Sequence, residues 1–276
     1  MYRIRTYNQI SSKGLDRLSA DQYVVGPEVS EPDAFMLRSQ KLHDEPVPDS
    51  LLAVARAGAG VNNIPVDDYT HRGVVVFNTP GANANAVKEL VTAALLLGSR
   101  RIVDGMNRVE ELTDIIDPDV MAKQLEKEKK QFAGSEISGR TLGVIGLGAI
   151  GSMVANMALE LGMKVAGFDP ALSVEAAWRV SSRVQKVDSL DALLKVSDFI
   201  SLHVPAIKQT HHLINAETLS RVRPGAKLLN FAREEIVDVN AVVNALDEGR
   251  LAGYITDFPV PALLGRSDTL LSLIHI

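Results

Sequence analysis

The chain has 276 residues, 46% of them hydrophobic, with a formal net charge of -5 at pH 7 and no cysteine. A chain of this length can bury a large core and form two domains of roughly 100–200 residues each. The acidic balance argues against nucleic acid or a membrane surface as a partner, and the absence of cysteine excludes disulfides and thiolate metal sites. Because the sequence shows neither an apolar leader nor a membrane-spanning run, we expect a soluble cytoplasmic protein.

Short apolar strands alternate with helical segments along the chain. This alternation is typical of α/β proteins, in which helices cover both faces of a parallel sheet. The predicted strands are residues 34–38, 74–78, 141–145, 164–169, 199–203, 227–230 and 254–256. The sequence therefore predicts an α/β protein with doubly wound parallel sheets.

The longest helical pattern extends from Ala84 to about Arg108, with apolar residues at helical spacing. We place the domain boundary in this helix, so that residues 1–97 form a first domain and residues 98–270 a second. Residues 271–276 match nothing around them and are interpreted as a non-native tail of a truncated reading frame. A genuine short apolar tail is the alternative.

A glycine-rich segment, Gly146-Leu-Gly148-Ala-Ile-Gly151, directly follows the predicted strand 141–145 and opens a predicted helix. In a dinucleotide fingerprint the first glycine permits a tight turn, the second lets the backbone approach a pyrophosphate, and the third lets helix and strand pack closely. The helix N-terminus adds unpaired N–H groups for the phosphates. The alternative is a glycine-rich turn with a structural role alone.

Asp169 ends the strand that follows this helix. A carboxylate at this place accepts hydrogen bonds from the ribose hydroxyls and repels a 2′-phosphate, which favours NAD over NADP. A surface aspartate without a ligand is the alternative interpretation.

Polar residues follow three later strands, at His203, at Asn230 to Arg233, and at Asp257. Ligands of open parallel sheets bind outside the carboxyl ends of the strands, so all three segments could face a cofactor. The guanidinium of Arg233 suits a carboxylate beside a carbonyl, although a surface ion pair with a neighbouring glutamate would explain it equally well. For His203 we favour a structural hydrogen-bonding role.

These segments, in this order, resemble the cofactor domain of the D-2-hydroxyacid dehydrogenases. Segments 56–63 (Arg-Ala-Gly-Ala-Gly-Val-Asn-Asn) and 78–89 resemble the substrate-side loop and the linking helix of the phosphoglycerate dehydrogenase branch of that family. The resemblance covers about residues 2–265. It implies a flavodoxin-like substrate domain, a Rossmann NAD domain and an active site in the cleft between them.

The resemblance also implies roles for single residues. Arg233 would be the catalytic arginine that orients the substrate. The implied cofactor-binding residues are Gly146, Gly148, Ala149, Ile150, Gly151, Asp169, His203, Val204, Pro205, Ala232 and Asp257. The implied substrate-binding residues are Arg38, Ser39, Gly58, Ala59 and Gly60. Arg38 follows an apolar strand and has donors suited to a phosphate, although a solvated arginine before a turn would look the same.

The implied reaction is NAD-dependent oxidation of D-3-phosphoglycerate to 3-phosphohydroxypyruvate in serine biosynthesis, by a homodimer or a higher homo-oligomer. The alternatives are another D-2-hydroxyacid dehydrogenase such as a hydroxypyruvate or glyoxylate reductase, a non-catalytic NAD-binding module, and a relative of adenosylhomocysteine hydrolase, whose cysteines and substrate motifs we do not find.

Three departures from the family pattern stand out. Glu234 replaces a glycine, and residues 258–262 (Phe-Pro-Val-Pro-Ala) lack the expected glutamate. The chain also does not reach the Pro-His-x-Gly-Ala segment that carries the proton-donating histidine, and His275 lacks its flanking residues. We therefore expect this chain to bind cofactor but to turn over little substrate.

Overall fold

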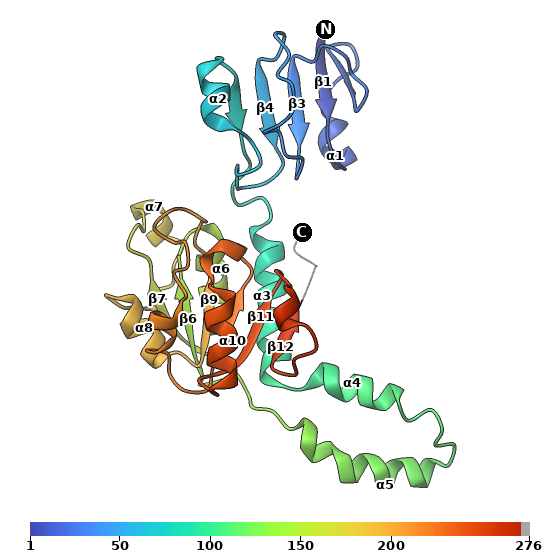
Figure 1. Ribbon diagram of the computed structural model, residues 1–276, viewed down its shortest axis with the longest axis vertical. Coiled ribbons are helices and arrows are strands. Elements are labelled where there is room, and N and C mark those ends of the chain that lie inside the picture. The colour runs from blue at the N-terminus through green and yellow to red at the C-terminus, as the bar shows by residue number, and fades with distance from the viewer. Residues whose placement is uncertain (272–276) are drawn as a thin grey trace. The chain divides into compact units, whose positions relative to one another are not determined.

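The computed structural model describes residues 1–271 and divides the chain into two compact units, Met1–Asn83 and Ala84–Ile276 (Figure 1). The division falls earlier than the boundary that we expected at residue 97, so residues 84–97 belong to the second unit. The reason is packing, because Val87, Val91 and Leu95 of this segment are buried in the core of the second unit. From residue 272 on, the expected non-native tail lies outside the described residues.

The first unit contains a five-stranded parallel sheet in the order β2-β1-β3-β4-β5. The strands are β1 (Tyr2–Thr6), β2 (Tyr23–Gly26), β3 (Ala34–Leu37), β4 (Ala53–Arg56) and β5 (Val75–Phe77). Two short helices, α1 (Ser12–Leu15) and α2 (Val66–His71), accompany them. This strand order is that of a flavodoxin-like fold. The buried side chains of Phe35, Leu37 and Val54 pack with Tyr69 of α2 to form its core.

The second unit contains a seven-stranded parallel sheet in the order β12-β11-β10-β9-β6-β7-β8. The strands are β6 (Thr141–Ile145), β7 (Lys164–Phe168), β8 (Gln185–Lys186), β9 (Phe199–Leu202), β10 (Ala226–Asn230), β11 (Leu251–Thr256) and β12 (Thr269–Leu271). Counted from β6, this is the Rossmann order with one added edge strand. The strand order reverses between β6 and β9, which marks the point where ligands bind in such sheets.

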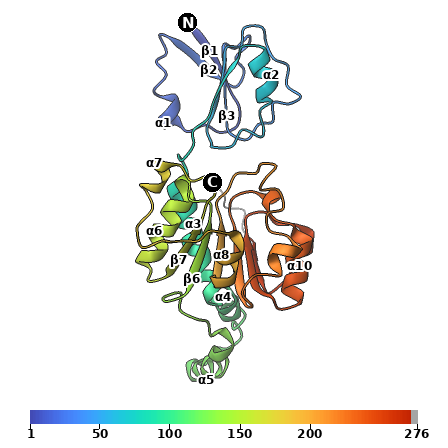
Figure 2. The ribbon, with the colours of Figure 1, turned by 90° about the vertical axis from the view of Figure 1, so that its left-hand side faces the viewer.

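Helices cover both faces of this second sheet, as Figure 2 shows. On one face lie α3 (Ala84–Ser99) and α6 (Ala149–Glu160), and on the other lie α8 (Leu190–Val196) and α10 (Val239–Asp247). Shorter helical segments are α7 (Val174–Ala177), α9 (Ala216–Leu219), η2 (Glu234–Ile236) and η3 (Pro261–Leu263). The α/β architecture with two doubly wound sheets confirms the predicted fold class. Within residues 1–271, no helix is long and apolar enough to cross a membrane.

The predicted helix from Ala84 to Arg108 is wrong as a single element. Helix α3 ends at Ser99, and α4 (Ile102–Glu110) begins after a break in which Arg101 has φ -79° and ψ 52°. The carbonyl of Ser99 accepts a hydrogen bond from the backbone of Ser135 instead of continuing the helix. The chain that returns at Ser135 therefore contacts the end of α3.

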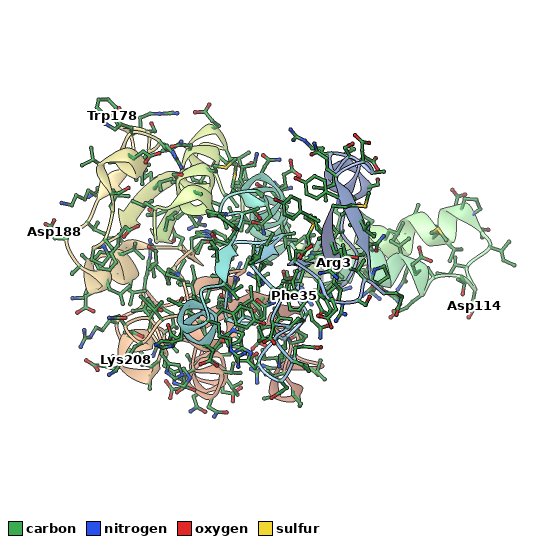
Figure 3. The ribbon with its side chains drawn as sticks, turned by 90° about the horizontal axis from the view of Figure 1, so that it is seen from above. Arg3, Phe35, Asp114, Trp178, Asp188 and Lys208 are labelled. Atoms are coloured by element: carbon green, nitrogen blue, oxygen red, sulfur yellow. The ribbon has the colours of Figure 1, made fainter. Side chains whose placement is uncertain are left out.

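Helix α4, helix α5 (Pro118–Glu128) and η1 (Lys129–Phe132) form a hairpin, residues 102–132, which we call the arm. It extends away from the sheet of the second unit (Figure 1), and Figure 3 shows Asp114 at its tip. The guanidinium of Arg108 joins the two helices, with its Nε 2.6 Å and its Nη2 2.9 Å from the carboxylate oxygens of Glu128. Hydrogen bonding to Arg108 lowers the pKa of Glu128.

Candidate active site

Two of the three fingerprint glycines are required by packing inside the protein. Gly146 has φ 89°, and a Cβ there would lie 2.6 Å from the carbonyl oxygen of His203. A Cβ on Gly151 would lie 1.8 Å from the carbonyl oxygen of Gly146. Gly148 differs, because a Cβ there would meet nothing within 4 Å. Contacts within the described chain therefore explain Gly146 and Gly151 but leave the space beside Gly148 open.

Helix α6 begins directly beside that open space. Its N-cap is Gly148, which has no side chain to satisfy the first N–H groups of the helix. These groups, at the start of Ala149 and Ile150, lie at the positive end of a helix of 12 residues. The arrangement favours an anionic group in front of α6.

Asp169 is fixed at the end of β7 by two hydrogen bonds to its carboxylate. One oxygen accepts the backbone N–H of Leu147 at 2.8 Å and the other accepts that of Ala171 at 2.9 Å. The carboxylate thus lies against the turn that carries Gly146. Each carboxylate oxygen has further lone pairs, so the group can still accept hydroxyls from a ligand.

His203 lies on the protein side of the same turn. Its backbone N–H donates to Ile145 at 2.8 Å, and its Nε2 lies 2.8 Å from the hydroxyl of the buried Ser201. Burial lowers the pKa of His203 to about 4, so the imidazole is neutral at pH 7. This geometry fits the structural hydrogen-bonding role that we favoured. Sequence reasoning missed Ser201, although its position two residues earlier on a strand places both side chains on one face.

Arg233 follows β10 in a turn that Asn230 closes. The fully buried Asn230 accepts the N–H of Ala232 at 3.1 Å and donates to the carbonyl of Arg233 at 2.8 Å. The guanidinium donates to the carbonyl of Ala232 at 2.6 Å. Among residues 1–271, no ion pair joins Arg233 to Glu234 or Glu235, which removes the interpretation of Arg233 as an ion-paired surface residue. Glu234 is not among the residues with positive φ, so the replacement of glycine there is tolerated.

The segments after β9, β10 and β11 meet at one edge of the sheet because these three strands are parallel neighbours. They bring together Val204 and Pro205, Ala232 and Arg233, and the buried Asp257. Next to Pro205 and Glu234 in the sequence lies an open surface depression of about 500 Å³. It is lined by Ala206, Ile207, Lys208, His211 and Glu235.

In the first unit, the implied substrate residues follow two neighbouring strands. Arg38 and Ser39 come after β3 and are exposed, and the Gly58–Ala59–Gly60 loop comes after β4. Arg56 ties the two segments together, because its Nε donates to the carbonyl of Arg38 at 3.0 Å and its guanidinium carbon lies 3.4 Å from the place of a Cβ on Gly58. Sequence reasoning quoted Arg56 within a motif but gave it no role.

Residues 99–275 match the family described as D-isomer specific 2-hydroxyacid dehydrogenase, NAD binding domain. The chain belongs to this family. The match covers the sheet of the second unit and the segment Gly146–Gly151, which we call the glycine turn, and it confirms the resemblance seen in the sequence.

Several named dehydrogenases and reductases are similar to much of the chain. The D-3-phosphoglycerate dehydrogenase of Synechocystis sp. is 38% identical over 242 residues, which are 87% of this chain and 41% of that protein. The hydroxypyruvate reductase of Thermotoga maritima is 38% identical over 202 residues, 73% of this chain and 60% of that protein. Among solved structures, the apo D-mandelate dehydrogenase of Rhodotorula graminis has a TM-score of 0.78 at 26% identity, with 100% of this chain and 88% of that chain covered. The chain thus spans about two fifths of the length of the phosphoglycerate dehydrogenase.

The cofactor of this family's domain is NAD, and the residues present fit it. The open space beside Gly148 and the uncapped start of α6 suit a pyrophosphate. Asp169, with spare acceptor capacity, suits the ribose hydroxyls. The assignment of Val204, Ala232 and Asp257 to the nicotinamide end stays a prediction.

Proposed function

We propose that the full-length protein oxidises D-3-phosphoglycerate to 3-phosphohydroxypyruvate with NAD, a step of serine biosynthesis in the cytoplasm. The observation that carries the substrate assignment is Arg38, an exposed residue at the carboxyl end of β3 whose backbone carbonyl accepts a hydrogen bond from Arg56, beside the Gly58 loop. Bidentate donors of this kind recognise phosphate. The similarity to proteins named D-3-phosphoglycerate dehydrogenase supports the same assignment.

In this proposal, bound NAD supplies a hydride acceptor at the nicotinamide. Arg233 holds the substrate carboxylate and the oxygen on C2, and it keeps its charge throughout because a guanidinium does not lose its proton. Asn230 fixes the backbone on both sides of Ala232, so that Arg233 starts from one defined turn. The side chain of Asp169 selects the cofactor without taking part in the chemistry.

The acid–base groups of the reaction are not found in this chain. Residues 258–262 carry no carboxylate, and the sequence has no Pro-His-x-Gly-Ala segment. We therefore propose that residues 1–276 alone bind NAD and turn over little, because general acid–base groups typically contribute about 10²–10⁴-fold each.

A second candidate is the reduction of hydroxypyruvate or glyoxylate. It is favoured by the similarity to the hydroxypyruvate reductase of Thermotoga maritima, of which this chain covers a larger share than of the phosphoglycerate dehydrogenases. An unphosphorylated acid would need Arg233 but not Arg38.

The two candidates are separated by comparing 3-phosphohydroxypyruvate, hydroxypyruvate and glyoxylate in a protein completed with a family-like C-terminus. Charge-assisted bonds to a phosphate contribute about 1.5–3 kcal/mol, so the phosphorylated acid should lead by about ten- to a hundredfold in kcat/KM. Arg38→Ala should remove most of this lead, and Arg233→Ala should damage turnover of every substrate. If Arg38→Ala leaves the ratio of kcat/KM values for the phosphorylated and unphosphorylated acids unchanged, the phosphoglycerate assignment is contradicted. NADH binding without turnover in the completed protein would instead favour a non-catalytic module.

For assembly, we propose a homodimer joined by the arm. Neither α4 nor α5 has a buried residue, and apolar side chains such as Met106, Val109 and Val120 are more than half exposed. Charges along the arm are complementary, since residues 102–119 carry six acidic and one basic side chain and residues 120–132 carry four lysines and two glutamates. A twofold axis that pairs the arms in antiparallel fashion would bring unlike charges together.

A further inference from the structure

One side-chain oxygen in the first unit accepts three consecutive backbone N–H groups. Asn8, which follows β1, presents its Oδ1 to the nitrogens of Ser39 and Gln40 at 2.8 Å each and to that of Arg38 at 3.4 Å. Asn8 has φ 63°, a left-handed conformation that asparagine tolerates better than most residues. The chain thus adopts an unusual backbone conformation at the point where this side chain reaches the segment after β3.

The carbonyls of the same segment are held by a second amide. Asn63, which is only 7% exposed, donates from Nδ2 to the carbonyl of Gln40 at 2.7 Å and to that of Arg38 at 3.5 Å. The Nε of Arg56 donates to the carbonyl of Arg38 as well. Residues 38–40 are therefore fixed on their donor side by Asn8 and on their acceptor side by Asn63.

We propose that Asn8 and Asn63 are positioning residues that preorganise Arg38 and Ser39 for an anionic substrate. Successive N–H groups that converge on one point form a concavity that commonly binds anions. Here the Oδ1 of Asn8 fills that concavity, so the backbone amides are used within the protein. Anion recognition then falls to the side chains of Arg38 and Ser39, whose backbone is ordered before the ligand arrives. This inference rests on the proposed function for its choice of a phosphorylated acid.

The energetic reason is preorganisation. A loop that is ordered only on binding lowers affinity by the entropy of ordering, whereas a loop that is already fixed does not. Arg38 is exposed and its side chain is long, so the backbone is the part that the protein can fix.

We call the hydrogen bonds of Asn8 and Asn63 to residues 38–40 the clamp. Amide hydrogen exchange tests the clamp without any ligand. Asn8→Gly removes the acceptor but accepts the positive φ without strain, and Asn8→Asp keeps both the acceptor and the tolerance. We expect the amides of Ser39 and Gln40 to exchange about tenfold faster in Asn8→Gly, as for the loss of one net hydrogen bond, and to regain protection in Asn8→Asp. Glu31→Gly is the matched control, since it removes a side chain at φ 47° elsewhere in the unit. Unchanged exchange in Asn8→Gly would overturn the inference.

Calorimetric titration of the 276-residue chain with 3-phosphoglycerate tests whether the clamp acts through Arg38. Asn8→Gly and Asn63→Asp should each weaken binding by about tenfold and leave NADH affinity unchanged, because the cofactor residues lie in the other unit. In an Arg38→Ala background, Asn8→Gly should have little further effect. If Asn8→Gly weakens 3-phosphoglycerate binding by the same factor in the Arg38→Ala background as in the native chain, Asn8 does not act through Arg38 and the positioning role is overturned. If the native chain does not bind 3-phosphoglycerate while the exchange result holds, the substrate assignment fails and the clamp stands.

Discussion

The carboxylate of Asp169 and the backbone nitrogen of Leu147 lie 2.8 Å apart and form a hydrogen bond between the end of β7 and the glycine turn after β6. The residue that we assign to the ribose therefore also holds the turn that should carry the pyrophosphate. The two halves of the cofactor site are joined by one side chain. A substitution at Asp169 should change cofactor choice and the stability of the turn together.

We predict that the chain binds NADH at least about tenfold more tightly than NADPH, because a 2′-phosphate would meet the Asp169 carboxylate. Asp169→Ala should narrow this difference and lower the free energy of unfolding by about 1 kcal/mol, through the lost hydrogen bonds. Asp169→Asn, which keeps one acceptor, should narrow the difference with a smaller loss of stability. Titrations followed by nicotinamide fluorescence and urea unfolding measure the two effects. Equal affinity of the native chain for both cofactors would contradict the ribose assignment.

Gly148 and Gly151 offer a matched pair that separates binding from folding. Gly151→Ala should lower the free energy of unfolding by about 2–3 kcal/mol, because its Cβ would collide with the carbonyl oxygen of Gly146 at 1.8 Å. Gly148→Ala should leave stability within about 0.5 kcal/mol, because its Cβ would enter open space, yet it should weaken NADH binding clearly.

Thermal unfolding and NADH titration of both variants test this contrast. If Gly148→Ala binds NADH as well as the native chain does, the space beside Gly148 is not the pyrophosphate site.

The sequence predicted the parts of the fold that have strong local patterns. The strands β6, β7, β9 and β10 and the glycine turn between β6 and α6 were found within one residue because buried parallel strands are continuous apolar runs. Edge strands such as β8, with two exposed residues, have no such pattern and were missed. The break after Ser99 was also missed, because helical periodicity continues through it and the residue whose N–H takes up the Ser99 carbonyl, Ser135, is distant in the sequence.

The candidate site shows the same division. Gly146, Asp169 and Arg233 could be found because each stands at a fixed place in a local motif. Asn8 could not, since its partners lie in a segment some thirty residues away. Ser201 is different, because its partner His203 is only two residues away and the alternation of side chains along a strand could have indicated it. Hydrogen bonds between segments that are distant in sequence leave no periodic trace in the sequence.

His203 should make the second unit less stable at acid pH. Its pKa is about 4 in the folded chain, below the ordinary value near 6.5, so the unfolded chain binds more protons between these values. The contribution to stability is complete above pH 6.5 and is lost as the pH falls toward 4, by up to roughly 3 kcal/mol. His203→Gln should flatten this part of the profile, because glutamine cannot take up the proton.

Urea unfolding at several pH values between 4 and 7.5 measures the slope. The matched control is His211→Gln, which removes an exposed imidazole from the same unit and should keep the native slope. If the free energy of unfolding of His203→Gln depends on pH as steeply as that of the native chain, groups other than His203 control the loss of stability at acid pH.

The arm should hold two copies of the chain together. On α4, Ile102, Met106 and Val109 recur at helical spacing and form an apolar stripe that is between 41% and 64% exposed. Exposed stripes of this kind mark interfaces, and a stable one buries about 1,200–2,000 Å² in total. Light scattering after size exclusion should show a dimer for the native chain.

Charge placed on this stripe should separate the copies without unfolding either one. A variant with both Met106→Asp and Val109→Asp should be monomeric and keep its NADH affinity, because neither residue is buried and both lie outside the glycine turn. Val174→Asp is the matched control, since Val174 is 78% exposed on α7 in the same unit. This variant should remain a dimer. Because the acidic and the lysine-rich parts of the arm would face each other, high salt should weaken the native dimer as well. A native chain that is monomeric at every concentration, or a Val174 variant that dissociates as readily as the arm variant, would show that the arm is not the interface.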